Sequence, residues 1–287
     1  MKKKKENEDS KIQWHPLYYS AFPVDFYDDR ENTEFDFEFA LDETTSSADI
    51  VMIRKREDVP FVNPIGHIFR GHNIVEAKSP SDGMGIQAYM HLLACACLYI
   101  SHRKRYSDHL RSDITVTLFR HKWPRKLVSY LRKECGCTVA QYNGYKGIFH
   151  VTGGTVMFPT QILVGRDLGE EHMALKLLGG TEDAAKHVKW ASEFIDRVPD
   201  EYYRDCVSQL ALFIARKRGQ FFSHARKEGG DMTAIQRAAM EEVFIPYFNS
   251  RLAEKDEELR QNKEELRQKD EEIAHLREQL ARLQGAD

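Results

Sequence analysis

Three charged side chains stand in two hydrophobic segments that have the composition of β-strands. Asp49 lies in segment 48–55, and Glu76 and Lys78 close segment 71–78. Turn-forming residues fill the link between the segments, so the sequence predicts an antiparallel pair of strands. In such a pair the start of the first strand lies beside the end of the second, and alternation puts Glu76 and Lys78 on one face. We therefore expect two carboxylates and an ammonium to meet at one edge of a sheet.

This combination of side chains indicates metal-assisted chemistry. Two carboxylates held close together repel each other, so one takes up a proton or a cation sits between them. A site with two acids and room for water suits Mg²⁺ or Mn²⁺. Lys78 could orient or help deprotonate a metal-bound water, or offset charge on a phosphate. The residues thus predict phosphodiester hydrolysis, and the alternative is a structural ion pair at a sheet edge.

The order of the predicted elements resembles a known family of nucleases. A helix, a strand, an Asp-bearing strand, a Glu-x-Lys strand, a helix and a further strand resemble the core of the PD-(D/E)XK nuclease superfamily. More narrowly, they resemble its bacterial members grouped with transposases or recombination-promoting nucleases. The residues that carry the resemblance are 14–16, 49–55, 73–80, 96–99, 124–127 and 159–164.

The resemblance implies an α/β fold with an αβββαβ core and a mixed sheet, and a role for each charged residue. Asp49 and Glu76 would bind Mg²⁺ (or Mn²⁺), and Lys78 would be the catalytic lysine. Ala48 stands where the motif has its proline. The superfamily also contains members that have lost activity, so a catalytically inactive nuclease-fold scaffold is the alternative.

Two further polar residues are candidates for the same site. The segment 34–42 alternates apolar and acidic residues, and Glu38 in it is the candidate third metal ligand; a strand with one solvated face is the alternative. Gln87 lies one turn into the predicted helix 86–102, where some relatives of this fold place a glutamine near the metal. Buried polar packing explains Gln87 equally well.

Two basic clusters flank the predicted strand 114–119. Cations interleaved with an aromatic side chain can neutralise phosphates and stack on an unpaired base, although solvated loops have the same composition. The candidate nucleic-acid-binding residues are Arg103, Lys104, Arg105, Lys122, Trp123 and Arg125.

Length and composition limit the class of protein. With 287 residues and 41% hydrophobic content, the chain can bury one full-sized core and carry an accessory region. The net charge of −3 gives no overall attraction to nucleic acid, so binding has to come from local patches. The five cysteines lack the Cys-x-x-Cys spacing of a zinc site and suit the cytoplasm. The apolar run 86–100 is too short to span a bilayer, and no membrane association is expected.

The C-terminal region carries a heptad pattern. Apolar residues recur every seven positions, and the last two heptads also fill the second core position; they are Leu252, Leu259, Leu266, Ile273, Leu276, Leu280 and Leu283. This pattern predicts a coiled coil over 248–284 that forms a homo-oligomer, with a dimer as the default. A solitary charged helix held by i,i+4 pairs is the alternative.

The sequence therefore predicts four regions and one main function. A basic, disordered tail covers 1–11, the nuclease-like domain 12–165, a helical extension 166–247 and the coiled coil 248–284. The favoured function is Mg²⁺-dependent cleavage of nucleic acid, with DNA as the favoured substrate. The alternative is a nuclease-fold scaffold or nucleic-acid-binding module that oligomerises through its coil.

Overall fold

The computed structural model describes the region that contains every strand predicted above. The described residues are 14–40, 47–102, 113–178, 184–211 and 213, with 260–261, 263–264 and 267–269 near the C-terminus. The chain divides into two compact units, 1–227 and 228–287. The predicted tail 1–11 and all apolar heptad positions lie outside the described residues.

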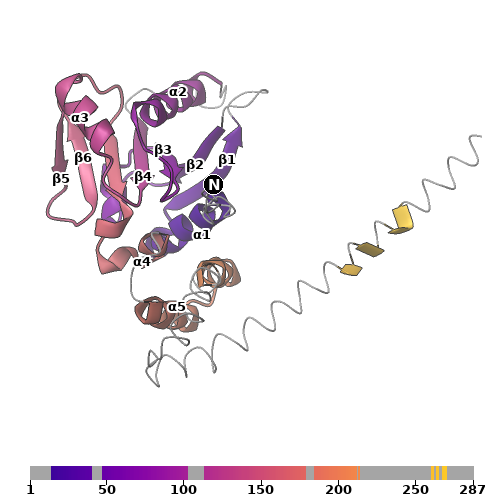
Figure 1. Ribbon diagram of the computed structural model, residues 1–287. Coiled ribbons are helices and arrows are strands. Elements are labelled where there is room, and N and C mark those ends of the chain that lie inside the picture. Colours follow the sequence, from indigo (N-terminus) through magenta and orange to yellow (C-terminus); the bar gives the residue numbers. More distant parts are fainter. Residues whose placement is uncertain are drawn as a thin grey trace, which may run out of the picture. The chain divides into compact units, whose positions relative to one another are not determined.

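Seven strands form one mixed sheet in the order β1-β2-β3-β4-β7-β6-β5 (Figure 1). Their bounds are β1 Thr33–Ala40, β2 Ser47–Arg54, β3 His72–Lys78, β4 Ile114–Arg120, β5 Thr138–Gln141, β6 Ile148–Thr152 and β7 Thr160–Val164. Strand β2 runs antiparallel to both β1 and β3, and its antiparallel pairing with β3 was predicted. Strands β3, β4 and β7 are parallel, and β6 and β5 return antiparallel beyond them. The protein is thus a mixed α/β fold whose elements follow the predicted order.

Helices cover both faces of this sheet (Figure 1). Their bounds are α1 His15–Asp25, α2 Ile86–His102, α3 Arg125–Lys133, α4 Met173–Leu177 and α5 Ala184–Arg197. Helices α2 and α3 share a core with apolar residues of β2, β3, β4 and β7. Helix α1 packs on the other face, where Tyr18 and Phe22 contact Phe119 of β4 edge-on. None of the helices described is long and apolar enough to cross a membrane.

The boundaries of most elements differ little from those predicted. Helix α2 and strand β3 match the predicted segments closely. The helix expected at the start of the core is α1, and a one-turn 3-10 helix at Tyr27–Asp29 follows it. After β7 the described chain is helical, as expected for the extension, up to the residues at 201–211. The rest of the predicted extension, from 214, lies outside the described residues.

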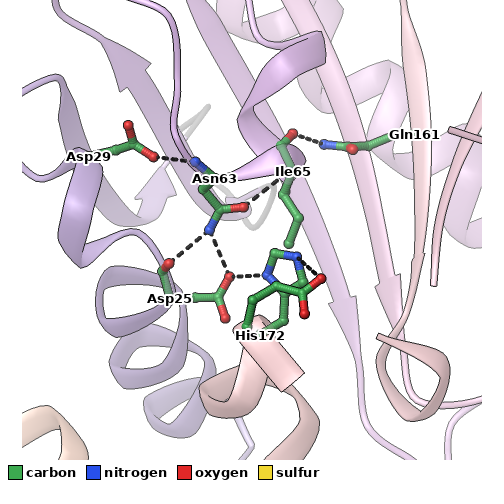
Figure 2. Close-up of polar contacts among 7 residues, drawn as sticks. Asp25, Asp29, Asn63, Ile65, Gln161 and His172 are labelled. Atoms are coloured by element: carbon green, nitrogen blue, oxygen red, sulfur yellow. Dashed lines mark hydrogen bonds and ion pairs between the residues drawn. The ribbon is translucent and has the colours of Figure 1, made fainter. Parts of the chain in front are cut away.

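A buried polar network holds α1 against the loop before β3 and the start of α4. Figure 2 shows Oδ2 of Asp25 between Nδ1 of His172, at 2.8 Å, and Nδ2 of Asn63, at 2.9 Å. The backbone N–H of Asn63 donates to Oδ2 of Asp29 at 2.8 Å. The side chains of Asp25 and His172 are inaccessible to solvent, at 0% and 1% exposure. This network joins three segments that are distant in sequence, and it holds the loop that leads into β3.

Candidate functional site

The register of β2 and β3 brings Asp49 to the end of β3. Ile50 pairs with Val75 and Met52 with Asn73, so the residue before Ile50 lies across from the residue after Val75. Oδ2 of Asp49 accepts a hydrogen bond from the backbone N–H of Ala77 at 2.8 Å. The expected meeting of Asp49 with the Glu-x-Lys segment is therefore found.

Glu76 is the most enclosed member of the group. Its side chain is 4% exposed, and Nζ of Lys78 forms an ion pair with its Oε1. Nδ1 of His91, on helix α2, lies 3.4 Å from its Oε2. Glu76 and Lys78 share a face because residues two apart in a strand point the same way. Both oxygens of Glu76 thus face a nitrogen-bearing side chain.

The turn after β3 leads the chain from Lys78 into α2. Oγ of Ser79 donates to Oδ2 of Asp82 at 2.8 Å, and the backbone N–H of Asp82 donates back to Oγ of Ser79 at 3.2 Å. The helix then starts with a bond from the backbone N–H of Tyr89 to the carbonyl of Gly85. This short turn sets the first turns of α2 above the end of β3.

The electrostatics of the group reflect the closeness of its two acids. Burial raises the pKa of Asp49, and the negative charge of Glu76 raises it further, while the Ala77 N–H, His15 and Lys78 act in the opposite direction. Burial lowers the pKa of Lys78, but its hydrogen bond to Glu76 and the charges of both acids outweigh this, so the net change is upward. Two carboxylates that repel each other in a partly enclosed site would be stabilised by a bound cation.

Sequence reasoning missed two histidines at this site. Nε2 of His15, at the start of α1, lies 3.9 Å from Oδ1 of Asp49. His91 follows Gln87 by four residues, and two polar residues at this spacing in an apolar helix were a signal for a functional face. One turn further, Sγ of Cys95 lies 3.7 Å from the His91 ring. Burial, with the charges of Glu76 and Asp49, raises the pKa of Cys95 to about 11, so this cysteine is a thiol at neutral pH.

The two histidines and the three central charged residues line one open cleft of about 1060 Å³. Asp49, Glu76 and Lys78 come from the ends of β2 and β3, and Gln87 and His91 come from α2. On the β4 side the cleft is lined by Arg120, Trp123, Pro124, Arg125 and Lys126. Acids therefore gather toward β2, and cations gather toward β4 and α3.

The other predicted site residues divide into three groups. Trp123, Arg125 and Gln87 line the cleft. Gln87 is exposed, so buried packing does not explain it. Lys122 is exposed but is not among the residues that line the cleft. The residues Arg103, Lys104 and Arg105 lie outside the described part of the chain.

Glu38, the candidate third ligand, is placed by its backbone only. Its neighbours Phe37 and Phe39 pair with Ile50 and Ala48, so the backbone of Glu38 lies opposite Asp49. The side chain of Glu38 is outside what the structure describes. Contacts between the Glu38 side chain and the carboxylates of Asp49 and Glu76 are therefore also outside what the structure describes.

The described side chains suit a hard divalent cation with few protein ligands. Within the described residues, no three His, Cys, Asp or Glu side chains form a group that could hold a metal ion. Mg²⁺ needs less, because it binds through one or two carboxylates, keeps several waters and takes further oxygens from substrate phosphates. Asp49 and Glu76 have the donor chemistry for this mode of binding.

Comparison with known proteins gave no relatives: no family model, no curated protein and no solved structure matches this chain. The chemistry of this protein is therefore inferred from the side chains of the cleft, their spacing and their charges.

Proposed function

We propose that this protein is a metal-dependent nuclease that hydrolyses phosphodiester bonds in nucleic acid, with DNA as the favoured substrate. The observation that carries the proposal is the meeting of Asp49, Glu76 and Lys78 at the end of β3 in an open cleft. The resemblance to the PD-(D/E)XK superfamily supports the same roles: Asp49 and Glu76 as ligands of Mg²⁺ or Mn²⁺, and Lys78 as the catalytic lysine.

Each side chain has a distinct task in this proposal. The Ala77 N–H orients Asp49, and burial of Glu76 between Lys78 and His91 holds its carboxylate in place. Lys78 can donate a hydrogen bond to a phosphate oxygen that enters the cleft. His91 and His15, each half-exposed, can accept or deliver a proton at the same place. A bound divalent cation would polarise the phosphate and lower the pKa of a coordinated water.

The β4 side of the cleft supports nucleic acid as the substrate. Trp123 is partly exposed beside the exposed Arg125 and Lys126, so an unpaired base could stack on its ring while the cations neutralise phosphates. The indole is held in place by an edge-on contact with Phe149, with ring centroids 4.6 Å apart. This local patch supplies the attraction that a net charge of −3 does not.

A second candidate function is a nuclease-fold scaffold that binds nucleic acid without cleaving it. It is favoured by the engagement of both Glu76 oxygens with Lys78 and His91, and by the lack of a three-ligand group among the described residues. Such a scaffold would assemble through the predicted coiled coil 248–284. In both cases we propose a cytoplasmic protein, since its five cysteines are free.

A plasmid-nicking assay separates the two functions. Supercoiled plasmid is incubated with the full-length protein in Mg²⁺, in Mn²⁺ and in EDTA. The nuclease reading predicts nicking that needs the cation and is lost in Lys78→Met but kept in Lys133→Met, which removes an exposed lysine at the end of α3. Nicking in EDTA, or in Lys78→Met, would place the chemistry elsewhere. Cation-independent binding without nicking would support the scaffold.

A further inference from the structure

Arg120 lines the cleft but has no role in the proposed hydrolysis. It is the last residue of β4 and pairs in register with Lys78, the last residue of the parallel strand β3. Side chains in register on neighbouring strands share a face. Arg120 lines the same cleft, so the row across the strand ends runs from Asp49 through Glu76 and Lys78 to Arg120.

The guanidinium of Arg120 has one buried N–H group without a partner among the described residues. Its Nε is buried and has no hydrogen-bond partner, and none of the carboxylates in the described ranges forms an ion pair with it. Buried donors in folded proteins are nearly always paired, with protein, water or ligand. Like charges in register, as in Lys78 and Arg120, also repel each other. Glu76 compensates Lys78, but no described acid compensates Arg120.

The surroundings of Arg120 add positive potential. Arg125 and Lys126 open helix α3 and line the same side of the cleft, and the first turn of α3 carries no acidic residue. The unpaired N–H groups at the start of a helix favour a negative charge nearby. The planar fork of an arginine matches the oxygens of a phosphate.

We propose that Arg120, Arg125 and Lys126 form a phosphate-binding subsite on the β4 side of the cleft. This proposal rests on the proposed function. The subsite binds one phosphate group of the nucleic-acid strand, while a neighbouring phosphate lies at Asp49 and Glu76. Arg120 is thus a positioning residue that sets the register of the strand. The phosphate is either an internal diester or a terminal 5′-phosphate, which have the same chemistry at the arginine.

The subsite is tested by binding without metal. Full-length protein in EDTA is titrated with inorganic phosphate by calorimetry, and with short labelled single strands that carry a 5′-phosphate or a 5′-hydroxyl by fluorescence anisotropy. We expect Arg120→Gln to weaken binding of phosphate and of strands by about tenfold or more, since it removes a charge-assisted hydrogen bond. Arg120→Lys keeps the charge but loses the planar fork of the guanidinium, so its affinity should lie between those of the wild type and Arg120→Gln. The matched control is Lys133→Gln, an equal loss of charge at the far end of α3.

A second variant and a second measurement keep the proposal testable if Arg120→Gln does not fold. Lys126→Gln changes an exposed side chain, so it leaves the fold intact and should also weaken binding. For the single strands, Arg120→Gln and Lys126→Gln should each reduce the slope of log affinity against log salt concentration by about one, as expected for one lost phosphate contact. An equal loss for both strands assigns the internal diester, and a larger loss for the phosphorylated strand assigns the 5′ end. If Arg120→Gln and Lys126→Gln both bind like Lys133→Gln, the subsite is overturned.

Failure of the subsite and failure of the nuclease are distinguishable. Binding in EDTA requires neither metal nor cleavage, so weaker phosphate binding by Arg120→Gln supports the subsite even in a protein that nicks no plasmid. Conversely, phosphate binding that is unchanged in both Arg120→Gln and Lys126→Gln overturns the subsite, even if Lys78→Met abolishes Mg²⁺-dependent nicking.

Discussion

The carboxylate of Asp49 accepts the backbone N–H of Ala77 at 2.8 Å, and this bond joins the start of β2 to the middle of the Glu-x-Lys segment. Asp49 therefore has a structural role that is separate from any role in binding a metal. Substitutions that keep the hydrogen bond but remove the charge can tell the two roles apart.

Asp49→Asn should abolish metal-dependent cleavage while the protein stays as stable as the wild type or becomes slightly more stable. An asparagine side-chain oxygen can still accept the Ala77 N–H, and loss of the charge removes repulsion from Glu76. Asp49→Ala loses the bond as well and should destabilise the fold by about 1 kcal/mol or more. Thermal unfolding and plasmid nicking, measured on both variants, check this. An Asp49→Asn protein that nicks at the wild-type rate would remove Asp49 from the site.

Lys78→Met should destabilise the protein, because it leaves the buried carboxylate of Glu76 beside Asp49 without its ammonium partner. We expect a loss of about 1–2 kcal/mol, smaller than for a fully buried ion pair because Lys78 keeps some contact with water.

The double variant Glu76→Gln/Lys78→Met, which removes both charges, should recover part of this stability. Urea unfolding of the wild type, both single variants and the double variant gives the coupling between the two side chains. Additive effects in this cycle would mean that the ion pair contributes nothing to folding.

The buried pair of His172 and Asp25 should make stability depend on pH (Figure 2). Burial lowers the pKa of His172, but the charge of Asp25 and the hydrogen bond to it outweigh burial; Glu171 also raises this pKa and Lys176 lowers it, and the net change is upward. The stabilisation is complete below the unfolded pKa of about 6.5 and is lost as pH rises through the higher folded value. The free energy of unfolding should therefore fall as pH increases above about 6.5.

His172→Gln should flatten this pH dependence and lower stability most below about pH 6.5, where the pair is charged. Urea unfolding over a pH series, with the wild type and His172→Gln in parallel, measures the effect. The same slope in both proteins would show that the pH dependence arises from other groups.

Deletion of residues 250–287 should lower the oligomeric state without unfolding the sheet domain, since a heptad seam buries its leucines only against another helix. Replacing Leu276, Leu280 and Leu283 with Ser should act like the deletion, whereas Lys255→Leu and Lys269→Leu should strengthen assembly. Light scattering reports the mass of each protein. An unchanged number of subunits after the deletion would favour the solitary helix. The exposed Arg267–Glu264 pair at 2.6 Å is typical of such a helix.

The sequence alone determined the local elements and the three central residues of the candidate site. The content of β-branched and apolar residues in 48–55 and 71–78 is a local property of each segment, so it predicts strands without knowledge of the fold. A short turn-rich link leaves antiparallel pairing as the natural arrangement, and that pairing brings Asp49 to Glu76 and Lys78.

The surroundings of these three residues depend on how distant segments pack together. His91 reaches Glu76 because helix α2 packs above the end of β3, and Arg120 stands beside Lys78 because β4 pairs with β3 in parallel register. Both relationships depend on how segments far apart in sequence pack on each other, which no local pattern encodes. For the same reason the link between Asp25 and His172, 147 residues apart, was not predictable, since it arises from the burial of two helical segments against one loop.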